Sequence, residues 1–188
     1  MSWKPSSVAN PPNKMRTLIL IPTETEAAPL RAACPDAPVR IAGVSMAAAA
    51  AATARIIAEE HPDRLILAGI AGASDRSVAG CEVVAVAGER IAELPGKYAV
   101  RYAADFIPAG LRTVESNTTN RTGVAASGTQ IENMEGAAFL AVCRAFGVPG
   151  AEVRAVSNYT DDPRSAWRIE ESAEKLAKTI IRILPDYE

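Results

Sequence analysis

Apolar runs alternate with helical patterns along the chain. Residues 17–21 are continuously apolar apart from Thr17 and rich in β-branched side chains, which is typical of a strand buried on both faces of a sheet. Further strands are predicted in four comparable runs: 39–43, 65–68, 82–87 and 152–156. Helices are predicted in four alanine-rich or amphipathic stretches: 24–33, 46–60, 135–146 and 169–183. This alternation predicts βαβ units.

Strands that alternate with helices indicate a three-layer α/β/α fold with a mostly parallel or mixed central sheet. At 188 residues and 48% hydrophobic, the chain suits a single domain with a full core. We expect that domain over residues 15–188, after a flexible proline-rich tail at 1–14. Residues 90–133 show no clear period, so we expect short strands and long loops there.

Composition narrows the possible partners and chemistry. A net charge of -2 and a pI near 5.6 provide no basic field for nucleic acid or an anionic membrane. No stretch reaches the length of a membrane span, and the polar N-terminus lacks an apolar signal core, so we expect a cytoplasmic protein. Three cysteines without CxxC spacing predict free thiols. One histidine, His61, argues against a Ser-His or Cys-His catalytic unit and against a histidine-rich metal site.

Polar or flexible residues stand at the points where ligands bind in open α/β sheets, outside the carboxyl ends of strands. The sequence offers four such places: Glu24 and Glu26, Gly69–Gly72, Met134–Glu135, and Ser157–Asn158. Each has an ordinary structural explanation as a helix-dipole partner, a turn or a cap. Their joint order is what makes a functional site the stronger interpretation.

This order resembles the purine nucleoside phosphorylase and nucleosidase superfamily. The segments that carry the resemblance are 43–45, 67–72, 133–138 and 152–158. Within the superfamily, Ser157-Asn158 followed by the Arg-x-x-Trp-x-Ile stretch at 164–169 is similar to the futalosine hydrolase family. The resemblance implies hydrolysis of the N-glycosidic bond of futalosine, a 5′-modified purine nucleoside of menaquinone biosynthesis, to release hypoxanthine. It implies no metal or organic cofactor and a homo-oligomer, with a dimer favoured.

The resemblance also implies roles for two acidic residues and their neighbours. Glu26 matches the carboxylate that activates water, and we prefer it to Glu24 on that alignment. Glu135 matches the carboxylate that accepts from the 2′- and 3′-hydroxyls of the ribose, with Met134 packed on the ribose face. Asn158, with Ser157 beside it, is placed at the leaving purine.

Backbone groups of Gly69, Ile70 and Ala71 are expected to line the pocket. The stretch 67–70 carries no cation to hold phosphate, which favours water as the acceptor. Arginines that are candidates for a carboxylate on the substrate tail are Arg101, Arg112, Arg121, Arg164 and Arg168, and residues 117–119 are candidates to border the base.

Three alternatives stay open. A methylthioadenosine/S-adenosylhomocysteine nucleosidase shares the fold and chemistry but is expected to carry Asp where this chain has Asn158. Asp can be protonated and donate to purine N7, whereas Asn donates only through its amide. The second alternative is a nucleoside-binding protein without turnover, and the third is an unrelated α/β domain.

Overall fold

The computed structural model describes residues 15–123 and 128–187, so the tail predicted at 1–14 lies outside the described residues. The strands are β1 (Thr17–Ile21), β2 (Val39–Ile41), β3 (Arg64–Ala73), β4 (Val83–Ile91), β5 (Tyr102–Ala103), β6 (Arg112–Thr118), β7 (Ile131–Asn133) and β8 (Gly150–Tyr159). The α-helices are α1 (Glu24–Ala33), α2 (Met46–Glu60), α3 (Gly136–Phe146) and α4 (Ile169–Ile183). Short 3-10 turns occur at Gly96–Tyr98, Arg164–Ala166 and Leu184–Tyr187.

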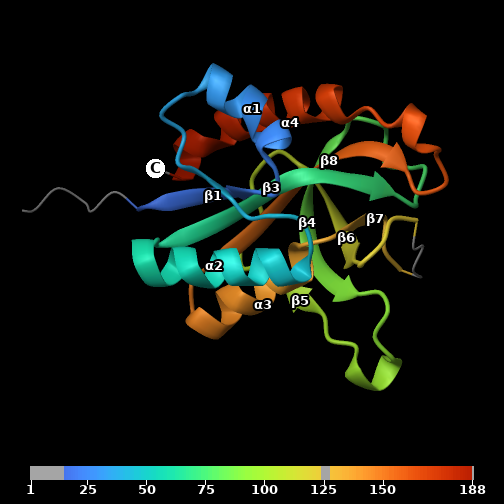
Figure 1. The fold of residues 1–188 in the computed structure, drawn as a ribbon, viewed down its shortest axis with the longest axis horizontal. Helices are drawn as coiled ribbons and strands as arrows, with labels where there is room; N and C mark the ends of the chain where they lie inside the picture. Colours follow the sequence, from blue (N-terminus) through green and yellow to red (C-terminus); the bar gives the residue numbers. More distant parts are fainter. Residues whose placement is uncertain (1–14, 124–127, 188) are drawn as a thin grey trace, which may run out of the picture.

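The helices cover both faces of a mixed central sheet, as Figure 1 shows. Helices α1 and α4 pack together on one face, and α2 and α3 pack together on the other. Every side chain of β1 is buried, as expected for a strand covered on both faces. The predicted three-layer α/β fold with a mixed sheet is therefore confirmed.

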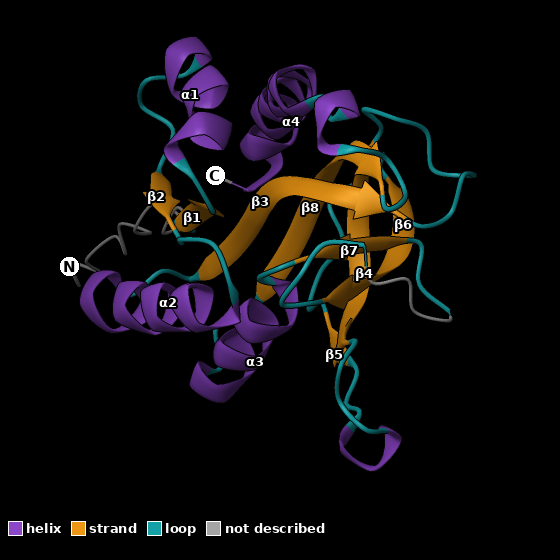
Figure 2. Cartoon of the chain, turned by 45° about the vertical axis from the view of Figure 1, so that its right-hand side comes forward, coloured by secondary structure: helices purple, strands orange, loops and turns teal. Residues whose placement is uncertain are grey.

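The sheet closes on itself at one end, which the strand pattern did not predict (Figure 2). Strand β3 pairs with β8 in parallel and with β7 in antiparallel orientation. Strand β8 pairs with β4, β4 with β6, and β6 with β7, which completes a ring of five strands. Because β1, β3 and β8 run parallel, their carboxyl ends meet at one edge, beside the start of α3.

Two of the predicted strands are longer than the sequence pattern indicated. The strand predicted at 65–68 extends through residues 69–72 of β3, and the strand predicted at 152–156 extends through residues 157–158 of β8. The two strands stay paired to Ala73 and Tyr159, with one irregularity: Gly72 pairs with Asn158 and Ala71 with Val156. The extra residue in β8 is a bulge, which redirects the side chains around it.

Local signals explain the ends of the helices. The Ser45 side chain accepts from the Ala48 N–H at the start of α2, and His61 ends that helix in the left-handed region at a φ of 48°. Gly147 ends α3 at a φ of 68°, a left-handed conformation that glycine adopts readily. Helix α4 buries Leu176, Ile180 and Ile183 against the sheet.

Three points raised by the composition concern the cysteines, membrane helices and metal clusters. The cysteines are free thiols, with Cys81 and Cys143 buried and Cys34 half-buried, as predicted. Within residues 15–123 and 128–187, no helix combines the length and apolar character needed to cross a membrane. In the same ranges, no cluster of three or more His, Cys, Asp or Glu side chains is arranged to hold a metal ion.

Candidate active site

A cavity of about 350 Å³ opens at the edge where β1, β3 and β8 end. Most of the residues singled out from the sequence line it: Glu26, Ile70, Ala71, Met134, Glu135, Ser157 and Asn158. These residues come from four separate segments of the chain, so the fold brings together what the sequence keeps far apart. Apolar groups such as Trp167 and Ile169 complete the wall beside them.

Glu26 lies in the first turn of α1, which begins after Thr23. The Thr23 side chain accepts from the Glu26 N–H at 3.2 Å and donates to Glu26 Oε1 at 2.8 Å. The other carboxyl oxygen, Oε2, accepts from the Ile70 N–H of β3 at 2.9 Å. With 6% of its surface exposed, the carboxyl is fixed between helix and sheet at the cavity wall.

Burial changes the acidity of this carboxyl. Desolvation raises the pKa of Glu26 above its ordinary value of 4.5, against the opposing effect of the hydrogen bonds from Ile70 and Thr23. A higher pKa makes the carboxylate a stronger base. Glu24, by contrast, leaves 67% of its side chain exposed and forms an ion pair with Arg31, so it lies outside the cavity.

Gly69 does not line the cavity but stands behind it. A Cβ at this position would lie 2.6 Å from Arg154 Nη1 and 3.0 Å from Glu26 Oε2. The glycine therefore permits a close approach of two charged groups to the β3 backbone. Gly72, three residues on, does line the cavity, and a Cβ there would lie 3.2 Å from Asn158 Nδ2.

Glu135 immediately precedes α3 but does not cap it, because its side chain forms no hydrogen bond to the first turn. Its carboxylate accepts from the Ser45 N–H and from Arg154 Nη1, each at 3.3 Å. Ser45 adopts a φ of 98°, a strained value for a non-glycine residue, and this conformation directs its N–H toward Glu135. The carboxylate is 4% exposed and faces the cavity together with Glu26.

Arg154 lines the cavity, and no role was assigned to it from the sequence. Its side chain is fully buried, and its guanidinium donates to Glu152 Oε1 at 2.7 Å, Asn133 Oδ1 at 3.0 Å, and the Ile70 carbonyl and Glu135 Oε2 at 3.3 Å. Burial alone would lower the pKa of Arg154, but the carboxylates of Glu152 and Glu135 raise it. An arginine inside an apolar strand pattern was the signal that could have identified it, because buried charges are paired.

At the bulge in β8, the consecutive residues Ser157 and Asn158 both line the cavity. The Ser157 hydroxyl donates to Asn158 Oδ1 at 2.8 Å, and Asn158 Nδ2 donates to the Tyr159 carbonyl at 2.9 Å. Both residues are buried, at 2% and 6% exposure. The second N–H of the Asn158 amide has no acceptor among the described residues, and the amide borders the cavity.

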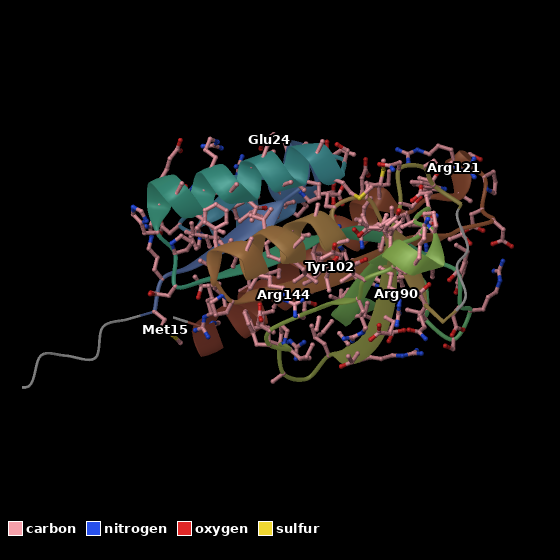
Figure 3. The ribbon with its side chains drawn as sticks, turned by 90° about the horizontal axis from the view of Figure 1, so that it is seen from below. Met15, Glu24, Arg90, Tyr102, Arg121 and Arg144 are labelled. Carbon is pink, nitrogen blue, oxygen red and sulfur yellow. The ribbon has the colours of Figure 1, made fainter. Side chains whose placement is uncertain are left out.

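The arginines considered for a substrate carboxylate differ in position. Arg101 pairs with Glu115, Arg112 with the Ser77 hydroxyl, and Arg168 with Glu171. Arg121 lies near Glu93, at the end of the molecule opposite Met15 (Figure 3). Only Arg164 of this set lines the cavity, where its guanidinium stacks 4.1 Å from the centre of the Trp167 ring.

The residues considered for the base differ as well. Thr119 lines the cavity, and its hydroxyl donates to Glu93. Asn117 and Thr118 are buried behind it and do not border the cavity. Of the stretch 117–119, the structure therefore leaves one residue in a position to meet a ligand.

Comparison with known proteins identifies the relatives of this arrangement. A family model of the phosphorylase superfamily matches residues 110–187. The resemblance seen in the sequence is confirmed. A curated relative, futalosine hydrolase of Thermus thermophilus, is 45% identical over 60 residues, which are 31% of this chain. The matched segment spans 27% of that relative's length.

Solved structures of two nucleosidase types share the fold. A futalosine hydrolase mutant of Helicobacter pylori superposes with a TM-score of 0.82 at 14% identity, covering 92% of this chain and 99% of the other. A 5′-methylthioadenosine/S-adenosylhomocysteine nucleosidase of Neisseria meningitidis, in complex with methylthio-immucillin-A, gives 0.80 at 20% identity, covering 92% and 100%. At these identities the likeness establishes the fold alone.

Proposed function

We propose that this chain is a nucleosidase that hydrolyses the N-glycosidic bond of a 5′-modified purine nucleoside, with futalosine as the favoured substrate. The observation that carries the proposal is that Glu26, Glu135 and Asn158 line one cavity. These are the three groups that the reaction needs: a base for water, an acceptor for the ribose and a donor for the purine. The 45% identical segment of a futalosine hydrolase supports the choice of substrate.

Glu26 is the base in this proposal. Cleavage passes through a sugar with oxocarbenium character, and water attacks its C1′ carbon. A carboxylate within hydrogen-bond reach of that water accepts its proton as the new C–O bond forms. The raised pKa of Glu26 strengthens it as a base, while its bonds from Ile70 and Thr23 hold its orientation.

Glu135 binds the sugar. The hydrogen bonds to its carboxylate, from the N–H groups of Ser45 and Met134 and from Arg154, are each long at 3.3 Å and leave lone pairs that can accept from ribose hydroxyls. The negative charge also favours the cationic sugar that develops as the bond to the purine breaks. Arg154 holds Glu135 from behind, so the carboxylate enters the reaction already oriented.

Asn158 holds the leaving purine. Its Nδ2 has a second N–H besides the one given to Tyr159, and that group can donate to an acceptor on the purine edge. A 6-oxopurine presents acceptors at both N7 and O6, so an amide donor suits hypoxanthine. The absence of Cβ at Gly72 keeps space beside this amide.

Water is the acceptor in this proposal, although a cation does lie beside the glycine segment. Residues 67–70 themselves carry no cation, as predicted. In the fold, however, the guanidinium of Arg154 on β8 lies next to Gly69. Its donors are engaged by Glu152, Asn133, Glu135 and the Ile70 carbonyl. Phosphate would have to displace these partners, which favours hydrolysis over phosphorolysis.

The proposal is tested by offering futalosine and methylthioadenosine to the full chain and measuring the free purine by chromatography. Faster release of hypoxanthine from futalosine supports the proposal. Faster release of adenine from methylthioadenosine favours the second nucleosidase type, and binding without release favours a nucleoside-binding protein. A role in menaquinone biosynthesis, a cytoplasmic location and a homo-oligomer, with a dimer favoured, stay predictions.

Asn158→Asp is expected to shift base preference toward adenine nucleosides. A protonated Asp donates to N7 but presents an acceptor oxygen beside the 6-position, which suits an amino group better than a keto group. The ratio of kcat/KM for methylthioadenosine over futalosine should rise on the order of tenfold, the effect of one hydrogen bond. An unchanged ratio would remove Asn158 from the base contacts.

Arg164→Gln is expected to weaken binding of a substrate whose 5′ tail carries a carboxylate. Among the described residues no carboxylate pairs with Arg164, so its charge is available at the cavity wall. KM for futalosine should rise about tenfold while KM for methylthioadenosine, whose tail is uncharged, stays the same. Arg168→Gln is the matched control, because Arg168 is paired with Glu171 away from the cavity. Equal effects of both variants would argue against a tail-binding role for Arg164.

A further inference from the structure

Two acidic side chains are fully buried beneath the cavity, and the proposed reaction does not use them. Glu89 of β4 and Glu152 of β8 each have 0% of their surface exposed. Both carboxyls face Gly136, the first residue of α3. A Cβ at Gly136 would lie 2.5 Å from Glu89 Oε1 and 2.6 Å from Glu152 Oε2, so the two carboxyls converge on one point.

The charges around this pair do not balance if every acid is ionised. Arg154 is the cation in contact with the pair, and it also holds Glu135. Glu26 of α1, at the cavity wall, also interacts electrostatically with this guanidinium. Arg90 and Arg101, on the outer side of β4, are paired with Glu115. Two adjacent buried carboxylates without a second cation cannot both remain ionised at low cost, and one must keep a proton.

Hydrogen bonds at Asn133 lead to the same conclusion. Its Oδ1 accepts from Arg154 and from the backbone of Glu135 and Gly136, which fixes the orientation of the amide. Its Nδ2 then faces three acceptors, Glu89 Oε1 at 2.5 Å, Ser116 Oγ at 3.0 Å and Glu152 Oε1 at 3.2 Å. The Ser116 hydroxyl carries a hydrogen of its own and lies within hydrogen-bond reach of Glu89. None of these donors reaches Glu152 Oε2, so the cluster is short of one hydrogen at that atom.

The place of the missing hydrogen follows from the partners of each acid. Glu152 accepts directly from Arg154 Nε at 2.7 Å, which stabilises its ionised form. The hydrogen-bond partners of Glu89 are neutral: the hydroxyls of Thr118, at 2.9 Å, and Ser116, and the amide of Asn133. Glu152 Oε2 is buried without a hydrogen-bond partner in the described residues, yet the Glu89 carboxyl lies within hydrogen-bond reach of Glu152. A proton on Glu89 would supply that partner.

We propose that Glu89 and Glu152 form an acid pair that holds one proton at neutral pH, with Glu89 as the donor and Glu152 as the ionised acceptor. The proton stays between the two side chains, and no bond to a ligand is made or broken. Desolvation and the charge of Glu152 raise the pKa of Glu89 well above its ordinary value, in agreement with this geometry.

The acid pair acts on the cavity through Arg154. An ionised Glu152 fixes the Nε side of the guanidinium, so that Nη1 points to Glu135. The neutral Glu89 adds a hydrogen bond without a second negative charge that would compete with Glu135 for the guanidinium. Glu89 and Glu152 are thus positioning residues for Glu135, a role that rests on the proposed function.

Infrared spectroscopy of the full chain tests the proton directly and does not depend on activity. Spectra of protein labelled with ¹³C-carboxyl glutamate are compared at neutral pH between wild type and Glu89→Gln. We expect a protonated-carboxyl C=O band in the wild type that shifts with the label and is absent from Glu89→Gln. Glu26→Gln is the matched control and should keep the band. The proposal would be overturned if the wild type shows no such band, or if the band remains in Glu89→Gln.

Variants test the asymmetry of the pair. Gln reproduces a neutral carboxyl, so Glu89→Gln should stay within about threefold of wild type in kcat/KM and in the unfolding equilibrium constant. Glu89→Leu removes the hydrogen bonds, so it should lose the kcat/KM and the stability that Glu89→Gln keeps. Glu152→Gln leaves Arg154 without its ion pair, and its unfolding constant should rise on the order of 100-fold. If Glu152→Gln changes stability little while Glu89→Gln is strongly destabilised, the assignment of Glu89 as the protonated acid and Glu152 as the ionised acid is overturned.

The two proposals fail separately in these experiments. If the chain releases no purine, the infrared band and the unfolding measurements still decide the acid pair. If purine is released but the band is missing, the nucleosidase proposal stands and the acid pair falls. Should Glu152→Gln fail to fold, the infrared comparison of wild type and Glu89→Gln gives the decision.

Discussion

Replacing Glu26 by Gln is expected to lower the rate of purine release on the order of 10²- to 10⁴-fold, because the amide cannot accept a proton from water. Nucleoside binding should stay near wild type, since Gln can still accept from the Ile70 N–H. Glu24→Gln is the matched control: its side chain is exposed and paired with Arg31, and its rate should be unchanged. Steady-state kinetics with equilibrium binding of the intact substrate to the variant give the measurement.

The same variant carries a prediction for pH and stability. Because burial raises the folded-state pKa of Glu26, the folded protein binds this proton more tightly than the unfolded chain does. Stability from this group is present below its ordinary pKa of 4.5 and is lost as pH rises through the folded pKa. Glu26→Gln should therefore be at least as stable as wild type at neutral pH.

With rising pH, activity should change in the opposite direction from the stability contributed by Glu26. Wild-type kcat/KM should rise with pH through the raised pKa of Glu26, as the carboxylate forms. This limb should lie above 4.5 and should be absent from Glu26→Gln. Equal purine release by the Glu26→Gln and Glu24→Gln variants would show that Glu26 is not the base.

Gly136→Ala is expected to disrupt both the fold around α3 and the cavity. The new methyl group would lie within 2.7 Å of three carboxyl oxygens of Glu89 and Glu152, and these buried side chains have no free space. We expect the free energy of unfolding to fall by about 1–3 kcal/mol, as for overpacked cores. Because Arg154 and Glu135 must shift with the acid pair, kcat/KM should also fall.

The control for this substitution is Gly96→Ala. No atom lies within 4 Å of a Cβ at Gly96, so the alanine meets open space and the free energy of unfolding should change by less than about 0.5 kcal/mol. Urea unfolding followed by circular dichroism measures both variants, and purine release measures the activity. If Gly136→Ala behaves like Gly96→Ala in both assays, the close convergence of the two carboxyls is not a feature of the protein.

Local patterns predicted most helices and strands of this fold because they are periodic within one element. Residues 46–60 and 169–183 are helices with the predicted bounds, and the buried run at 17–21 is a strand. The strand predicted at 65–68 ended too early for a different reason. Glycines such as Gly69 and Gly72 often end a strand locally, but β8 pairs along residues 69–72 and β7 pairs with Gly72, which keeps this segment extended. Pairing between distant strands is not visible in a local pattern.

The cavity residues were predictable where they follow a strand or begin a helix, as Glu26 and Glu135 do. Arg154, Glu152 and Glu89 were not assigned a role, because their partners come from four segments and only the closed sheet brings them together. A charged residue in an otherwise buried strand predicts that a partner exists. It does not say which residue the partner is.

The most direct measurement of the central claim is a crystal structure of the chain with a non-hydrolysable analogue of the nucleoside in the cavity. The account predicts both ribose hydroxyls within about 2.6–3.2 Å of the Glu135 carboxylate and a water between Glu26 and C1′. It also predicts the purine edge against the amide of Asn158. A ribose bound away from Glu135, or a Glu26 carboxyl turned from C1′, would contradict the account.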